Sequence, residues 1–295
     1  MEKITIGVLS YKRIDDLLLL LEDLYKLNKP VKLIVVNNDV TNDIYDTISH
    51  IKSNKQIELQ HIAPDSNLGV AGGRNLILDN AIGKFTIFFD DDLYIPNINE
   101  ILDVCFDLFK DENVSGIAFN VKDYNTKGYS RFEIPHSNKN IDMSSSFYTY
   151  LMIGAGHAVR NDFIKKHGGY PDDFGLYGME EIDLSFKIIS KKSFIIYDPR
   201  LVVEHKKSPD GRLPNSSVLK NLFVNKSRIA RKYLPFKYFI TTMLVWGGVY
   251  ILKTRSVNNY FSSIREIFSY SLSSDCKLEK EQVKYIKKIK GRLWF

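Results

Sequence analysis

The chain has 295 residues, of which 44% are apolar and 13% aromatic, and its 41 Lys and Arg against 35 Asp and Glu give a net charge of +6. This apolar content excludes an intrinsically disordered chain, which buries too little surface to offset the entropy of folding. Two cysteines, Cys105 and Cys276, exclude a disulfide framework and a cysteine metal quartet. The first residues lack the apolar core of a signal peptide, so we expect a cytoplasmic protein.

The first 120 residues alternate between apolar runs rich in β-branched residues and segments with helical apolar spacing. Strands are predicted at residues 4–9, 33–36, 57–62, 85–89 and 114–119, and helices at 17–27, 44–51, 76–82 and 98–109. This order is typical of an α/β fold with a mostly parallel sheet covered by helices on both faces. Ligands bind such sheets beyond the carboxyl ends of the strands, so the residues that follow each strand are the candidates for a site.

After about residue 128 the alternation weakens. A helix is predicted over 180–189, short strands at 194–197 and 201–204, and helices from Pro214 onward with breaks at Pro235 and near Ser273. The charge is also uneven, because residues 1–205 carry −8 and residues 206–295 carry +14. A mildly acidic body therefore bears a strongly basic tail, which favours an anionic partner surface.

The tail contains an uncharged run of 15 residues, 238–252, between Lys237 and Lys253. A membrane-spanning helix needs roughly 20 apolar residues, so this run is short for a span. With its basic flanks it favours an interfacial helix in peripheral contact with a membrane. The alternatives are a helix packed on the sheet and a homodimer interface. Nucleic acid is not expected as a partner, because no recognised nucleic-acid-binding motif occurs.

Three adjacent carboxylates, Asp90, Asp91 and Asp92, follow the strand predicted at 85–89. They repel one another, and a hard divalent cation such as Mn²⁺ or Mg²⁺ would relieve that repulsion. At the end of a strand they are placed to hold a metal-bound diphosphate, whereas the alternative is an acidic, solvated turn. His205 follows the strand at 201–204 and is a candidate imidazole ligand, although a single histidine there is usually unremarkable.

A glycine-rich segment, residues 66–75, follows the third strand and opens a helix with the sequence SNLGVAGGRN. Its glycines permit close backbone approach, the helix N-terminus favours anions, and Arg74 is able to contact phosphate. The alternative is a glycine-rich turn at a helix start. The segment is not a P-loop, because no G-K-[ST] follows.

A second acidic group, Glu180, Glu181 and Asp183, stands at the start of the helix predicted over 180–189. Acids there complement the helix dipole, which is one interpretation. The other is a general base, since a carboxylate that is desolvated beside other acids has a raised proton affinity.

The first two strands end in polar residues that suit a nucleotide. Ser10 and Tyr11 follow the first strand, and Asn37 and Asn38 follow the second. Tyr11 is able to stack on a base and the asparagines to bond its edge, whereas ordinary turn chemistry is the alternative.

In this order the motifs resemble those of the GT-A-fold inverting glycosyltransferases of family 2. The matching segments are IGVLSYKR, IVVNND, SNLGVAGGRN, FFDDDLYIP, MEEIDLSFK and PRLVVEH, which lie between residues 6 and 205. The resemblance implies a Rossmann-like GT-A catalytic domain over 1–212, with a nucleotide-sugar half at 1–120 and an acceptor half at 121–212. Residues 213–295 would form a basic, amphipathic helical extension outside the shared motifs.

The resemblance also implies roles for single residues. The strand-end acids resemble the family's D-x-D signature, in which counting back from Pro96 favours Asp91 as the metal ligand and a literal match favours Asp92, with His205 assisting. Glu180-Glu181 resembles the family's E-D pair, whose second acid is the base, so Glu181 is the expected base. The residues expected at the nucleoside and its phosphates are Ser10, Tyr11, Arg13, Asn37, Asn38, Asn67, Gly69, Arg74 and Asp90.

We therefore expect a hexosyltransferase that moves a sugar, with inversion, from a nucleoside-diphosphate sugar to a glycan or lipid-linked acceptor with the help of Mn²⁺ or Mg²⁺. A role in bacterial surface polysaccharide synthesis would suit it. UDP or dTDP is the expected nucleotide, although Asn37 stands where the family usually has an acid, and its amide is able to donate as well as accept a hydrogen bond. The alternatives are a nucleotide-sugar nucleotidyltransferase, whose glycine-rich basic loop after the first strand is missing, and a non-catalytic protein that binds nucleotide or membrane.

Overall fold

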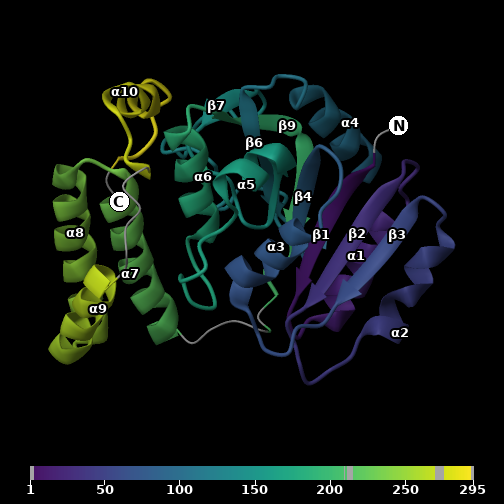
Figure 1. The fold of residues 1–295 in the computed structure, drawn as a ribbon, viewed down its shortest axis with the longest axis horizontal. Helices are drawn as coiled ribbons and strands as arrows, with labels where there is room; N and C mark the ends of the chain where they lie inside the picture. The colour runs from purple at the N-terminus through teal and green to yellow at the C-terminus, as the bar shows by residue number, and fades with distance from the viewer. Residues whose placement is uncertain (1–2, 209, 211–214, 270–275, 294–295) are drawn as a thin grey trace.

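In the computed structural model, which describes residues 3–208, 210, 215–269 and 276–293, a nine-stranded sheet forms the centre of the body (Figure 1). Its strands are β1 (Ile4–Ser10), β2 (Val31–Asn37), β3 (Ile57–Ile62), β4 (Phe85–Asp90), β5 (Leu93–Tyr94), β6 (Val114–Asp123), β7 (Phe147–Thr149), β8 (Gly156–Arg160) and β9 (Phe194–His205). Their order is β3-β2-β1-β4-β8-β6-β9-β5, with β7 paired to β9. The strands from β3 to β4 are parallel, and β8 runs antiparallel between β4 and β6. The predicted α/β fold is confirmed, with a mixed sheet beyond β4.

Helices cover both faces because the strands bury apolar side chains on both sides. In β2, Leu33 and Val35 join an apolar cluster with Leu17 of α1, whereas Ile34 joins a second cluster with Ile77 of α3. The helices are α1 (Ile14–Leu24), α2 (Tyr45–Ile48), which continues as the 3₁₀-helix η1 (Ser49–Ser53), α3 (Gly69–Asp79), α4 (Ile98–Leu108), α5 (Asn161–His167), α6 (Glu180–Ser190), α7 (Asn215–Tyr233), α8 (Phe236–Thr254), α9 (Val257–Ser269) and α10 (Lys280–Lys288).

Two local predictions differ from the structure. The short strands expected at 194–197 and 201–204 are one strand, β9, which passes Pro199 through an irregularity in its pairing with β6. The amide of Asn120 donates to the Pro199 carbonyl at 2.8 Å and holds the two strands together there. The helix expected from residue 76 begins at Gly69, so residues 69–75 of the glycine-rich segment already belong to it. Pro235 precedes α8 as predicted, and the break near Ser273 lies outside the described residues.

The C-terminal helices pack against the body. Helix α7 lies beside α6, and α8 and α9 pack on α7 at one end of the molecule (Figure 1). Asp183 of α6 is fully buried and accepts hydrogen bonds from Lys232 at 3.0 and 3.1 Å and from the Tyr233 hydroxyl at 3.0 Å. Among the residues described, no helix has both the length and the apolar character needed to cross a membrane.

Candidate active site

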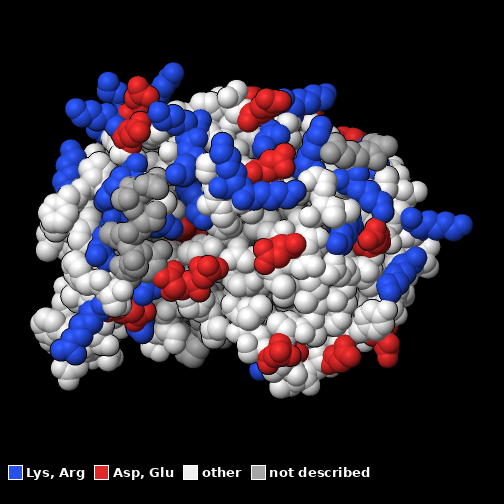
Figure 2. Space-filling view, viewed as in Figure 1, with Lys and Arg blue, Asp and Glu red and all other residues white. Residues whose placement is uncertain are grey.

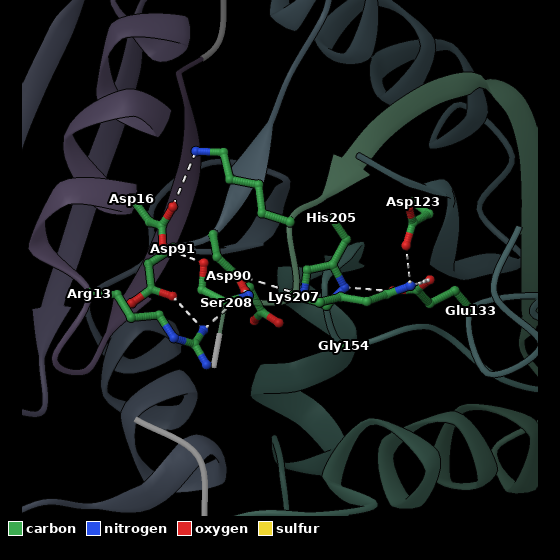
Figure 3. A network of polar contacts seen from close by, with 12 residues as sticks. Arg13, Asp16, Asp90, Asp91, Asp123, Glu133, Gly154, His205, Lys207 and Ser208 are labelled. Carbon is green, nitrogen blue, oxygen red and sulfur yellow. Dashed lines mark hydrogen bonds and ion pairs between the residues drawn. The ribbon is translucent and has the colours of Figure 1, made fainter. Parts of the chain in front are cut away.

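The sheet register brings the polar strand ends together. In parallel pairing Leu9 lies opposite Asp90 and Ser10 opposite Asn37, so the carboxyl ends of β1, β2 and β4 share one edge. After β4 the chain turns into β5, whose Leu93 pairs with His205 at the end of β9. The end of β4 therefore lies close to His205 at the end of β9 (Figure 3).

The acids and the histidine form a cluster with the character of a metal site. Asp90, Asp92 and His205 each offer one ligand atom, and these atoms all lie within 4.8 Å of one another. The Oδ1 atom of Asp92 lies 3.2 Å from His205 Nε2 and is buried, but it accepts no hydrogen bond of good geometry. A buried carboxylate oxygen without a hydrogen bond is costly unless a cation meets it. Two carboxylates and an imidazole are a donor set that Mn²⁺ accepts, so the residues fit the expected metal.

Further contacts orient the imidazole of His205. Its Nδ1 lies 2.6 Å from Glu133 Oε1, and Glu133 is in turn paired with Lys207 at 2.9 Å (Figure 3). Burial alone would lower the pKa of His205, but the carboxylates of Asp92 and Glu133 raise it to about 10. Each ring nitrogen of His205 thus lies near a carboxylate, Nε2 near Asp92 and Nδ1 near Glu133. Glu133 comes from the loop between β6 and β7, and no sequence motif pointed to it.

Asp91 is directed away from this cluster. It accepts a hydrogen bond from the backbone N–H of Tyr11 at 3.1 Å and from Arg13 Nη1 at 3.0 Å. Burial raises the pKa of Asp91 to about 7 in spite of the attraction of Arg13. Arg13 Nη1 also lies 3.3 Å from Asp92 Oδ2, so its single positive charge is shared between the two acids. The structure thus brings Asp90, Asp92 and His205 together and uses Asp91 to hold the turn after β1.

Arg74 links the cluster to the second acidic group. It is only 3% exposed, and its Nη2 donates to Asp90 at 3.1 Å and to the carbonyl of Gly154 at 2.9 Å. Its Nη1 lies 3.8 Å from Glu180 Oε1. The sequence led us to expect Arg74 at the phosphates. In the structure it is enclosed by carboxylates.

The two glutamates at the start of α6 differ in their surroundings. Glu180 is buried, and its Oε2 accepts from the backbone N–H of Gly178 at 2.7 Å. Glu181 leans against Gly154, where an added Cβ would lie 2.8 Å from its Oε1, and its Oε2 is buried without a hydrogen-bond partner. Burial raises the pKa of both glutamates, because the charged forms lose their hydration. Among the described residues, Glu181 Oε2 thus has no hydrogen-bond partner, whereas Glu180 Oε2 has the Gly178 N–H.

A pocket of about 200 Å³ lies beyond the ends of β1 and β2. The Asn37 side chain is held by its own loop, since its amide donates to the carbonyls of Asp39 and Asn42 and its oxygen accepts from the Asp39 N–H. The lining residues are Ser10, Lys12, Arg13, Ile14, Asn37, Asp39, Asn42 and Ile44. Of these, Ser10, Arg13 and Asn37 are among the residues predicted at the nucleoside, and Lys12 and Asp39 belong to the same two strand-end stretches, whereas no motif pointed to Asn42. The Tyr11 ring lies 5.2 Å from Lys12 Nζ.

The remaining predicted residues shape the loop before α3. Asn67 accepts a hydrogen bond from the Gly69 N–H at 2.8 Å, and Asn38 donates to the Gly69 carbonyl at 2.9 Å. Gly69 has a φ of +69°, at which any side chain is strained, and a Cβ added there would clash with the backbone of Leu176. Asn67 and Gly69 lie at the start of α3, and Asn38, which follows β2, contacts this helix start.

Comparison with known proteins identifies the family. A model of glycosyl transferase family 2 matches residues 5–168, more than half of the chain. The chain belongs to glycosyltransferase family 2. An uncharacterized protein of Haemophilus influenzae is 36% identical over 148 residues, which cover 50% of this chain and 80% of that protein. Family membership confirms the resemblance that the motifs indicated and identifies the chain as a glycosyltransferase by family.

Solved structures share the fold of this family 2 chain. The mannosyltransferase PcManGT from Pyrobaculum calidifontis, in complex with GDP-Man and Mn²⁺, has a TM-score of 0.62 at 14% identity and covers 97% of this chain and 79% of its own. Residues 1–349 of S. aureus TarS, in complex with UDP-GlcNAc, have a TM-score of 0.60 at 17% identity and cover 89% of this chain and 73% of their own. Against a longer TarS structure, this chain spans 39% of that chain. These likenesses confirm the GT-A fold.

Proposed function

We propose that this family 2 chain is a metal-dependent, inverting glycosyltransferase that takes its sugar from a UDP- or dTDP-type donor. The observation that carries this proposal is the placement of the metal-binding cluster. On one side Arg13 connects Asp92 to the pocket beyond β1 and β2, and on the other Arg74 connects Asp90 to the glutamate pair. Sugar transfer from a nucleoside-diphosphate sugar needs the same order in space: a nucleotide site, then a metal at the diphosphate, then a base.

The proposed metal ligands are Asp90, Asp92 and His205, which places Asp91 in a supporting role. A divalent cation held there supplies positive charge that offsets the negative charge developing on the departing diphosphate. Glu133 holds the His205 ring in orientation through Nδ1 and leaves Nε2 directed at Asp92. Arg13 keeps the other oxygen of Asp92 in place.

Glu181 is the proposed base. Its partnerless Oε2 accepts the proton of an acceptor hydroxyl while that oxygen attacks the anomeric carbon from the side opposite the diphosphate. The bond from the anomeric carbon to the diphosphate oxygen breaks with its electron pair, which leaves nucleoside diphosphate and inverts the centre. Glu180 stays bonded to the Gly178 N–H and orients the turn.

For the acceptor we propose a glycan or lipid-linked glycan in bacterial surface polysaccharide synthesis. The test uses the full chain with Mn²⁺ and a panel of UDP-, dTDP- and GDP-sugars, with and without mixed lipid-linked acceptors. Release of nucleoside diphosphate with sugar transfer is expected. Release of pyrophosphate would indicate a nucleotidyltransferase, and release of neither, together with nucleotide binding, would indicate a non-catalytic binding protein.

A peripheral contact with the cytoplasmic face of a membrane is the second part of the proposal. Helix α8 exposes apolar side chains along its outer face, with Leu244 at 72% and Leu252 at 78% exposure. Lys237 and Lys253 flank this face, and Figure 2 has uncharged surface at the end of the molecule where α8 lies, with basic side chains above and below it. Two copies joined through this face would bring together two tails of +14 each, so an anionic bilayer suits it better than a homodimer.

Sedimentation with anionic vesicles over a salt series tests this contact. Binding that weakens with salt and is lost in a Leu244→Glu, Leu252→Glu double variant is expected. Leu19→Glu in α1, where the native leucine is 49% exposed, is the matched control and should bind like the native chain. Recovery of the native chain in the supernatant at low salt would refute the contact, and a dimer in analytical ultracentrifugation that the double variant abolishes would assign the face to a second copy.

A further inference from the structure

Helix α7 carries a row of four polar side chains, of which three are buried. Asn221, Asn225, Arg228 and Lys232 stand four, three and four residues apart, which puts them on one helix face. Asn225 is 2% exposed, Arg228 7% and Lys232 9%. Polar groups at such depth are costly unless they are hydrogen-bonded, so their partners indicate what the row is for.

Most of the partners are backbone carbonyls of the loop that leads into α6. The Asn225 amide donates to the carbonyls of Phe174 at 3.0 Å and Gly178 at 2.9 Å. Asn221 donates to the Tyr177 carbonyl at 2.8 Å, and Arg228 donates to the Asp173 carbonyl at 2.7 Å. The row thus holds residues 173–178, the segment directly before Glu180 and Glu181.

This loop is irregular and needs such support. Gly175, Gly178 and Met179 all have positive φ, at 74°, 120° and 73°. The loop also contacts the start of α3, on the side proposed for the sugar donor, where the Val70 N–H donates to the Leu176 carbonyl at 2.9 Å. The Gly178 N–H donates to Glu180, while the Gly178 carbonyl accepts from Asn225. One residue, Gly178, therefore joins α7 to the glutamate pair through the two peptide groups on either side of its Cα.

We infer that Asn225 is a positioning residue for the proposed base, and that α7 is part of the active site rather than an appendage to it. By fixing both ends of the turn 174–178, Asn225 sets where α6 begins and hence where the free oxygen of Glu181 points. The inference rests on the proposed function, because it assigns Asn225 a role through Glu181. A shift of about 1 Å at a base is enough to lower turnover by about 10²-fold.

The test compares Asn225→Leu with Ser227→Ala in the full chain. Ser227 lies on the same helix, is fully buried, and its hydroxyl has no hydrogen-bond partner among the described residues, so it is a matched control. We expect Asn225→Leu to lower kcat per folded molecule at least tenfold with the donor KM within twofold, and Ser227→Ala to leave both near the native values. A lower melting temperature with kcat per folded molecule unchanged would overturn the inference, as would an equal loss of donor affinity.

Asn221→Ala keeps the inference testable if Asn225→Leu does not fold, because it removes only the bond to the Tyr177 carbonyl at the exposed end of the row. It should lower kcat about two- to fivefold with donor KM unchanged, and a native kcat would then overturn the inference.

Failure of this inference and failure of the proposed function give different results. If the native chain transfers no sugar, the proposed function fails and this inference with it. If Glu181→Gln is inactive while Asn225→Leu and Asn221→Ala turn over normally, the positioning role alone is wrong.

Discussion

Replacing Lys232 by Met should destabilise the whole protein, because it breaks the buried ion pair that joins α7 to α6. Asp183 is fully buried, and Lys232 Nζ lies 3.0 and 3.1 Å from its two oxygens. Without Lys232 the carboxylate keeps only the Tyr233 hydroxyl at 3.0 Å among the hydrogen bonds described, which leaves a negative charge uncompensated in the interior.

Breaking a buried pair by removing one partner costs about 3–5 kcal/mol, and we expect a loss of that size in the free energy of unfolding. It corresponds to a fall in melting temperature of roughly 6–20 °C. The measurement is urea denaturation followed by circular dichroism. Lys110→Met is the control, since Lys110 is paired with Asp107 at 3.0 Å but its side chain is 78% exposed, and such surface pairs contribute about 0–1 kcal/mol.

A second variant isolates the charge as the cause. Adding Asp183→Asn to Lys232→Met removes the uncompensated carboxylate, so the double variant should recover at least half of the lost stability. The reasoning is refuted if Lys232→Met and Lys110→Met differ by less than about 1 kcal/mol, or if the double variant is less stable than Lys232→Met alone.

Three further predictions test the site. Glu181→Gln should bind nucleoside diphosphate as the native chain does, while its turnover should fall by about 10²-fold or more because an amide accepts no proton. If Glu181→Gln retains turnover and Glu180→Gln loses it, the base is Glu180. Mn²⁺ should tighten nucleoside diphosphate binding in calorimetry. Asp92→Asn should abolish this effect and Asp91→Asn should keep it, because of these two acids only Asp92 lies with Asp90 and His205. The opposite pattern would make Asp91 the ligand. Gly154→Ala should lower turnover roughly tenfold with donor binding intact, because its Cβ would lie 2.8 Å from Glu181 Oε1 and push the base aside; native kinetics would show that the base has room to move.

Much of the parallel half of the sheet and the order of the motifs were readable in the sequence, because those signals are local. An apolar run rich in β-branched residues predicts a strand wherever it occurs, and polar residues directly after such a run lie at the edge of a parallel sheet. That reasoning placed Ser10, Asn37, Asp90 and His205 at one edge, where the structure has them. It also placed Glu180 and Glu181 at the start of a helix.

The directions of the side chains were decided by contacts between distant segments. Three adjacent aspartates are equivalent in sequence, but the N–H of Tyr11 and the guanidinium of Arg13 turn Asp91 inward, while the β5–β9 pairing presents Asp92 to His205. Glu133 reaches His205 from a loop 72 residues away and belongs to no pattern. In the same way, the asparagines of α7 look in sequence like solvent-facing residues of a basic helix. Only the packing of α7 on α6 gives them the carbonyls of residues 174–178 as partners, because hydrogen bonds across such separations depend on the fold and not on local periodicity.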